Sequence, residues 1–158
     1  SRVQAWKELE KIKVSGRAKS IGVSNYMQRH LDELFAASEI KPVVNQIELH
    51  PWLSQQPLKA YCESRYIHIE AYSPLAHGQK VSDVSLKPMA DKHGKTIAQV
   101  LLRWSAQKGN IVLVKSVSPK RIAENFGIFD FKLDDADMEK IDALNENLRT
   151  CWDPSNTP

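Results

Sequence analysis

The sequence predicts an α/β fold with a parallel β-sheet, and three observations support this. Short runs rich in β-branched residues alternate with segments whose apolar residues recur at helical spacing. The runs are separated by enough residues for a helix, which parallel strands require. Polar residues also close each run at its carboxyl end, and in parallel α/β folds that edge is where ligands bind.

The first segments of the chain alternate between helix and strand. Apolar residues recur at helical spacing from Val3 to Ile12, and Gly16 suits the end of this first helix. The run 18–25, AKSIGVSN, is short and ends in small polar residues, which predicts a strand. Leucines and a phenylalanine at helical spacing then predict a helix over 28–38.

The middle of the chain continues the alternation. The run 42–51, PVVNQIELHP, has proline at both borders and β-branched residues inside, which suits a strand. Helical spacing predicts a helix over 57–65, and YIHIEAYSPL at 66–75 predicts the third strand. After a looser loop, the clearest helical pattern covers 96–107, and IVLVKS at 111–116 predicts the fourth strand.

Two more helices are expected before the chain ends. One covers 119–126, where Ser118 suits the N-cap and Pro119 the first helical position. The other covers 134–148 and is apolar on one face. With 158 residues the chain is long enough for one hydrophobic core, so a single domain over 1–158 is expected.

Composition limits the classes of function. Hydrophobic residues make up 42% and charged residues 26%, as in ordinary globular proteins. A net charge of +3 is too small to indicate a nucleic acid or a membrane as partner, and no apolar run is long enough to span a bilayer. The two cysteines form neither a disulfide framework nor a metal-binding pattern, so we expect a reduced, cytoplasmic protein.

Several common site motifs are missing from the sequence. There is no GxGxxG or GxxxxGK[ST] loop, which removes the main sequence support for a doubly wound dinucleotide-binding fold. The histidines share no metal spacing and no serine lies in a nucleophile elbow, so neither a metal site nor a hydrolytic triad is expected. Either an open α/β sheet or part of an α/β barrel remains.

The stretch between the fourth strand and the next helix predicts an anion site. With Ser118 as N-cap and Pro119 after it, free backbone N–H groups attract anions to the start of the helix. Lys115 before the helix and Arg121 in its first turn add positive charge, and arginine can hold a phosphate through two parallel hydrogen bonds. The alternative is a solvated helix start with ordinary surface cations.

Other polar strand ends also have two interpretations. Gln46 and Glu48 share one face of their strand and either hydrogen-bond inside a barrel or, for Gln46, present an amide to a ligand. Tyr72 is either a core aromatic residue or a platform for a flat ring. Turn chemistry by itself also favours polar residues at such positions.

Four motifs resemble the aldo-keto reductase family: GVSNY at 22–26, VVNQIELHP at 43–51, EAYSPL at 70–75 and VKSVSPKRIAENFGIFDFKL at 114–133. They occur in the family's order and span nearly the whole chain. The resemblance implies a (β/α)8 barrel of the TIM type that reduces carbonyls with NADPH. It further implies that the chain covers about the last four βα units, a half-barrel.

The resemblance assigns cofactor roles residue by residue. The nicotinamide carboxamide would be held by Ser24, Asn25 and Gln46, and Tyr72 would stack on the nicotinamide ring. The pyrophosphate would be lined by Ser73, Leu75 and His77, the last standing where the family often has a small hydroxyl residue. The clamp on the adenosine 2′-phosphate would be Lys115, Ser116, Val117, Ser118 and Arg121, and the adenine contacts Glu124 and Asn125. NADP(H) is therefore the expected cofactor. Val114 stands where the family usually has proline.

The family's catalytic set, a tyrosine proton donor assisted by lysine, aspartate and histidine, has no matching motif in this sequence. We therefore expect no catalytic residue here. The tail over 145–158 resembles the family's substrate loop, so Cys151 and Trp152 are expected to contact a small carbonyl substrate. The leading hypothesis is the cofactor-binding half of an NADPH-dependent reductase of aldehydes and ketones. The alternative is a catalytically inert NADP(H)-binding or structural half-barrel.

A half-barrel would leave strand edges unpaired and apolar side chains exposed. The strands over 18–25 and 111–116 would form these edges. We therefore expect the chain to meet an N-terminal barrel half, a second copy of itself, or the rest of a longer polypeptide.

Overall fold

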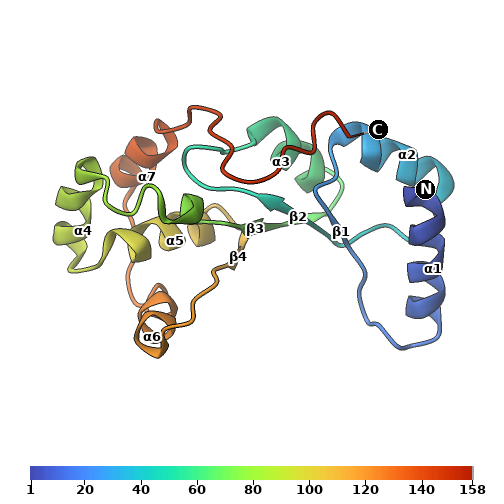
Figure 1. Ribbon diagram of the computed structural model, residues 1–158, viewed down its shortest axis with the longest axis horizontal. Helices are drawn as coiled ribbons and strands as arrows, with labels where there is room; N and C mark the ends of the chain where they lie inside the picture. The colour runs from blue at the N-terminus through green and yellow to red at the C-terminus, as the bar shows by residue number, and fades with distance from the viewer. Residues whose placement is uncertain (158) are drawn as a thin grey trace. The chain divides into compact units, whose positions relative to one another are not determined.

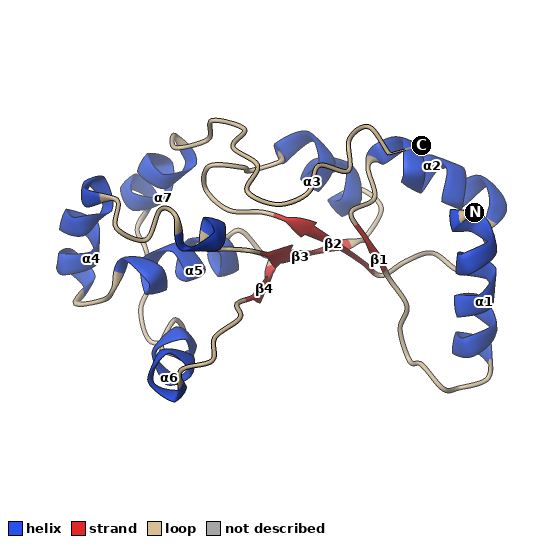
Figure 2. Ribbon diagram, viewed as in Figure 1, coloured by secondary structure: helices blue, strands red, loops and turns tan. Residues whose placement is uncertain are grey.

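The computed structural model describes residues 1–157 of the chain. Figure 1 labels the elements in chain order, and Figure 2 separates helices from strands. The strands are β1 (Val23–Ser24), β2 (Val44–Glu48), β3 (His68–Tyr72) and β4 (Ile111–Leu113). The α-helices are α1 (Arg2–Val14), α2 (Gln28–Ala37), α3 (Gln56–Glu63), α4 (Lys87–His93), α5 (Ile97–Gln107), α6 (Pro119–Phe126) and α7 (Asp135–Asp142). Two 3-10 turns, η1 (Ala76–Gly78) and η2 (Val84–Leu86), follow β3.

The strands form a sheet in the order β1-β2-β3-β4, so β1 and β4 are its outer strands. Strand β1 runs parallel to β2, with Val23 opposite Asn45 and Ser24 opposite Gln46. Helices connect each strand to the next, as parallel strands require. The sequence pattern therefore predicted the four strands and the helices that connect them, and the structure adds their order in the sheet.

Contacts divide the chain into two compact units. The first contains residues 1–47 and 56–70 together with the tail from Asp153, and the second contains residues 48–55 and 71–152. The expected single domain over 1–158 stays a prediction.

In the first unit, helices α1 and α2 pack together, and β1 pairs with β2. Trp6, on α1, is buried, and its indole Nε1 donates a hydrogen bond to the carbonyl oxygen of Ile40 at 2.8 Å. Leu31 and Leu34 supply the buried face of α2. Burial of these large apolar side chains is the main source of stability for this unit.

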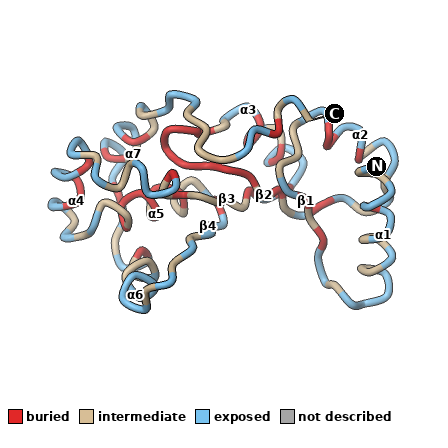
Figure 3. The backbone as a smooth tube through the Cα atoms, in the orientation of Figure 1, coloured by how far each residue is buried: buried red, intermediate tan, exposed pale blue. Residues whose placement is uncertain are grey.

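In the second unit, α5 packs against α4, β4 and α6. Thr96 caps α5 through a capping box with Gln99, and the helix buries Leu101, Leu102 and Trp104. The indole Nε1 of Trp104 donates to Asp142 Oδ1 at 2.8 Å, which fixes the end of α7. The segment that continues from β2, residues 48–54, is buried throughout (Figure 3).

Helix α6 has the predicted bounds, but the expected helix over 134–148 is wrong beyond Asp142. The backbone N–H groups of Glu146 and Leu148 instead donate to the carbonyl oxygen of Trp52, at 3.3 and 2.9 Å. This distant carbonyl replaces the helical acceptors four residues back, so the chain leaves the helix. None of the helices within residues 1–157 is long and apolar enough to cross a membrane.

We predict that Gly22→Ala lowers the stability of the chain. A Cβ at position 22 would lie 2.2 Å from Val44 Cγ1 and 2.8 Å from the Val44 carbonyl oxygen, so β1 must move away from β2. Overpacking of this kind costs about 1–3 kcal/mol. The midpoint of urea unfolding should fall for Gly22→Ala and stay unchanged for the control Ser20→Ala at an exposed position. Equal midpoints for the two variants would contradict the prediction.

Candidate functional site

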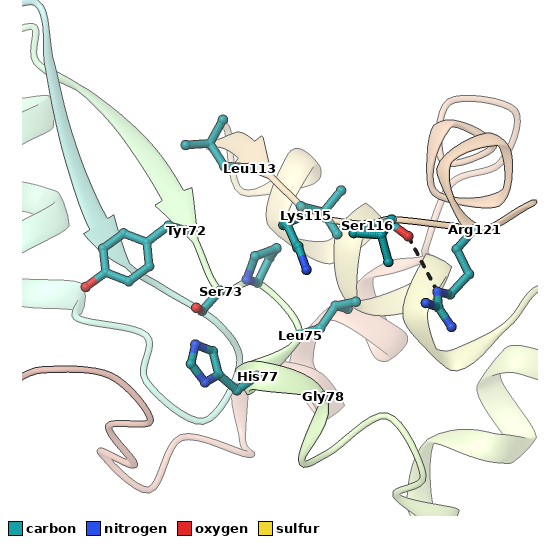
Figure 4. A pocket seen from close by; sticks show the side chains of 12 residues that line it. Tyr72, Ser73, Leu75, His77, Gly78, Leu113, Lys115, Ser116 and Arg121 are labelled. Carbon is teal, nitrogen blue, oxygen red and sulfur yellow. Dashed lines mark hydrogen bonds between the residues drawn. The ribbon is translucent and has the colours of Figure 1, made fainter. Parts of the chain in front are cut away.

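A cavity of about 700 Å³ lies in the second unit, at the carboxyl ends of β3 and β4 (Figure 4). Its volume lies within the range of small-molecule sites. The wall consists of Tyr72, Ser73, Pro74, Leu75, His77, Gly78, Leu113, Val114, Lys115, Ser116, Val117 and Arg121. The polar strand ends that the sequence singled out at 72–73 and 115–116 therefore meet around one space.

A tight turn after β3 shapes one side of the cavity. Ser73, Ala76 and His77 have left-handed backbone conformations, with φ of 49°, 47° and 54°. The N–H of Ala76 donates to the carbonyl oxygen of Ser73, and the N–H of Gly78 to that of Leu75, both at 2.8 Å. Non-glycine residues rarely adopt positive φ, and such conformations concentrate at functional sites.

The opposite side is the segment from Lys115 to Arg121. Ser118 caps α6, its Oγ accepting the Arg121 N–H at 3.4 Å. Ser116 Oγ accepts two hydrogen bonds, one from the N–H of Ser118 at 3.2 Å and one from Arg121 Nε at 3.5 Å (Figure 4). Within the described chain this wall contains the cations Lys115 and Arg121 and no carboxylate, which suits an anion.

A second polar group lies in the first unit, at the ends of β1 and β2. Ser24 Oγ and the N–H of Asn25 both donate to the carbonyl oxygen of Gln46, at 3.1 and 2.8 Å. The amide Nε2 of Gln46 donates to Glu70 Oε2 at 2.5 Å. Glu70 was not among the predicted site residues, although its position in EAYSPL two residues before Tyr72 places both side chains on one face of β3. Glu70 fixes the orientation of the Gln46 amide.

The remaining predicted cofactor residues lie on or before α6 and outside the cavity wall. Ser118 acts as the helix cap, and Glu124 Oε1 accepts a hydrogen bond from Thr96 Oγ1 at 2.8 Å. Asn125 lines a second, mostly apolar cavity of about 510 Å³ between α6 and the end of α5. The cofactor roles of all fourteen residues stay predictions.

The tail segment before Trp152 contacts the cavity wall. Cys151 Sγ lies 3.3 Å from Ser73 Oγ and 3.4 Å from His77 Nε2. Trp152 is 60% exposed. Cys151 therefore borders the predicted cofactor site, and the substrate roles of both residues stay predictions.

Tail residues Thr150 and Cys151 hydrogen-bond to the buried carboxylate of Glu48. The Glu48 side chain is 0% exposed, and its Oε1 accepts the N–H of Thr150 at 2.7 Å and the Thr150 hydroxyl at 2.6 Å. Oε2 accepts the N–H of Cys151 at 3.2 Å. The sequence allowed Glu48 to hydrogen-bond inside a barrel but did not indicate with which residues, because no local pattern links it to positions about a hundred residues away.

Burial and hydrogen bonds set the protonation states here. Burial acts to raise the pKa of Glu48, but the hydrogen bonds from Thr150, His50 and Cys151 outweigh it, so the pKa lies below its usual value. Burial lowers the pKa of His50, although the Glu48 carboxylate opposes this. Since an ionised carboxylate only accepts, the neutral His50 carries its proton on Nε2 and donates to Glu48 Oε1, 3.1 Å away.

Comparison with known proteins identifies the family. A sequence profile described as "Aldo/keto reductase family" matches residues 2–146. The chain belongs to the aldo/keto reductase family. It is 48% identical to aldose reductase B of Dictyostelium discoideum over 97% of this chain and 50% of that protein. It is also 48% identical to glyoxal reductase of Bacillus subtilis (strain 168), over 94% of this chain and 54% of that protein.

Solved structures agree with the sequence relatives. A mutant of Gox0644, crystallised in complex with NADPH, matches with a TM-score of 0.94 at 44% identity, over 99% of this chain and 58% of that one. The chain thus spans about half the length of the relatives it matches. The predicted fold class, an α/β fold of the (β/α)8 type represented by about four βα units, is confirmed.

We predict that acid removes the stabilising contribution of Glu48. Its pKa in the folded chain lies below the usual 4.5, so the contribution is present above pH 4.5 and is lost as the pH falls through the folded-state pKa. The Tm difference between wild type and Glu48→Gln should therefore be largest above pH 4.5 and shrink on acidification. The exposed Glu139 provides the control, since Glu139→Gln should show no such trend. A pH-independent difference for Glu48→Gln would contradict the assignment.

Proposed function

We propose that this chain provides the NADP(H)-binding half of an enzyme that reduces aldehydes and ketones to alcohols. The observation that carries the proposal is the cavity that Tyr72 and the two cations Lys115 and Arg121 all line (Figure 4). A dinucleotide phosphate needs positive charge, and a nicotinamide ring needs a flat partner. The NADPH complex of the Gox0644 mutant supports the same cofactor.

The residues divide into three roles. Lys115 and Arg121 bind the adenosine 2′-phosphate, which favours NADP(H) over NAD(H). Tyr72 offers its ring to the nicotinamide and so determines which face is turned toward the substrate. When bound, the cofactor supplies the hydride for the carbonyl carbon. Ser24, Asn25 and Gln46 hold the carboxamide, with Glu70 orienting the Gln46 amide.

The proton for the carbonyl oxygen comes from outside this chain in our proposal. Burial raises the pKa of Tyr26, and burial together with the hydrogen bond to Asp32 raises that of Tyr61 to about 12. A general acid works best with a pKa near the working pH, which neither phenol has. Tyr66 is 91% exposed. This supports a donor in the remaining part of a complete barrel.

The outer strand β4 supports a partner for this half. Ile111 and Leu113 on β4 are 46% and 37% exposed, although strand residues of this kind normally face a core. An outer strand also offers its backbone to another strand. We propose that an N-terminal barrel half covers this edge, in the same or another polypeptide, with a second copy of the chain as the alternative occupant.

The cofactor assignment predicts a selective effect of Arg121. Arg121→Ala should weaken NADPH binding by about 1.5–3 kcal/mol, the cost of a lost hydrogen bond to a charged group, and should affect NADH much less. Binding is followed by nicotinamide fluorescence during titration. Lys120→Ala is the matched control, because Lys120 is the exposed neighbour outside the cavity wall. An equal loss for both nucleotides would contradict a 2′-phosphate site.

The half-barrel assignment predicts that activity requires a second fragment. NADPH oxidation with an aldehyde, followed by absorbance, should be absent for the chain alone. It should appear when the chain is mixed with the part of Bacillus subtilis glyoxal reductase that it does not cover. Nucleotide binding without turnover in the mixture would favour the inert NADP(H)-binding alternative. Turnover by the chain alone would contradict the missing proton donor.

A further inference from the structure

Glu48 connects the end of β2 to the tail in a way that the family assignment does not explain. Its carboxylate is 0% exposed, and it receives three hydrogen bonds from two consecutive tail residues, Thr150 and Cys151. Arg149 Nη1 lies 3.8 Å from Oε2 of the same carboxylate. A buried charge persists only where donors compensate the lost hydration. In this chain the tail supplies most of those donors.

The same tail residues reach the candidate cavity. Cys151 donates its backbone N–H to Glu48, and its Sγ contacts Ser73 Oγ and His77 Nε2. Ser73 and His77 both line the cavity. Cys151 therefore links the Glu48 carboxylate to the cavity wall.

We propose that Glu48 is a positioning residue whose buried carboxylate holds residues 149–151 against the wall of the nucleotide cavity. The identity of the ligand in that cavity rests on the proposed function, whereas the attachment of the tail does not. His50 assists by donating to Glu48 Oε1 from the other side. A carboxylate accepts these bonds through both oxygens, whereas a glutamine amide has one accepting oxygen and presents an N–H₂ group to the other donors.

A carboxylate that merely fills the core would give a different result. Both cysteines would then become accessible together, because each would react only when the whole chain unfolds. Loss of a positioning residue releases the tail while the core stays folded. Cys151 is half-buried and lies in the tail contact, so its reaction rate reports release of the tail. Cys62 is fully buried in the first unit, so its reaction rate reports unfolding of the core.

The test measures the rate at which each thiol reacts with an aromatic disulfide reagent, with the labelled cysteine identified by mass spectrometry. In Glu48→Gln the rate at Cys151 should rise on the order of tenfold, because at least one charge-assisted hydrogen bond is lost. The rate at Cys62 should stay constant. Trypsin should also cleave faster after Arg149. The exposed Glu139 again gives the control, Glu139→Gln, with wild-type rates expected.

A second pair of variants tests the contact from the tail. Thr150→Val keeps the shape but removes the hydroxyl donor, and Thr150→Ser keeps the donor. Cys151 should react faster in Thr150→Val, and Thr150→Ser should restore the wild-type rate. If Glu48→Gln unfolds the chain and raises the rates at both cysteines, the two Thr150 variants still test whether the hydrogen bond to Glu48 holds the tail.

The outcomes separate the two proposals. A Cys151 rate that is unchanged in Glu48→Gln with a constant Cys62 rate would overturn the positioning role, as would equal rates in Thr150→Val and Thr150→Ser. The thiol assay contains no nucleotide. A failure of wild-type chain to bind NADPH would therefore overturn the proposed function and leave the result on Glu48 intact.

Discussion

The parallel connection of the strands is the constraint on which the candidate site depends. Because a helix returns the chain to the same edge before each new strand, the carboxyl ends of neighbouring strands lie on one side. In the second unit this brings Tyr72 and Ser73, at the end of β3, to the same cavity as Lys115 and Ser116, which follow β4. The first turn of α6, which Ser118 caps, then adds Arg121. Residues more than forty positions apart thus form one wall.

The buried charge at Glu48 imposes a second constraint. Removing a carboxylate from water is costly unless several donors replace the hydration. The donors come from His50, two residues away, and from Thr150 and Cys151 far along the chain. A carboxylate at position 48 connects the end of β2 to tail residues 150–151 through hydrogen bonds. An apolar residue there would pack without requiring any specific partner. The buried carboxylate therefore defines the position of the tail.

Local signals account for what the sequence predicted correctly. Ser118 and Pro119 specify the start of α6 through cap and backbone geometry that involve only neighbouring residues, and the bounds of this helix agree. Helix α7 was predicted too long because the carbonyl of Trp52, remote in sequence, takes the N–H groups that a helix would use. Eight of the proposed cofactor residues line the cavity, but the tail contact of Glu48 has no local signature.

The surface around α6 bears on how the chain behaves in solution. Phe126 and Phe129 are 77% and 66% exposed, and their rings meet edge to face with centroids 5.6 Å apart. Attraction between exposed apolar groups weakens on cooling, since its origin near room temperature is largely entropic. Cold, dilute samples should therefore hold monodisperse particles, whereas warming and concentrating would drive reversible clustering through these rings. The two exposed rings therefore make the association of the isolated chain depend on temperature.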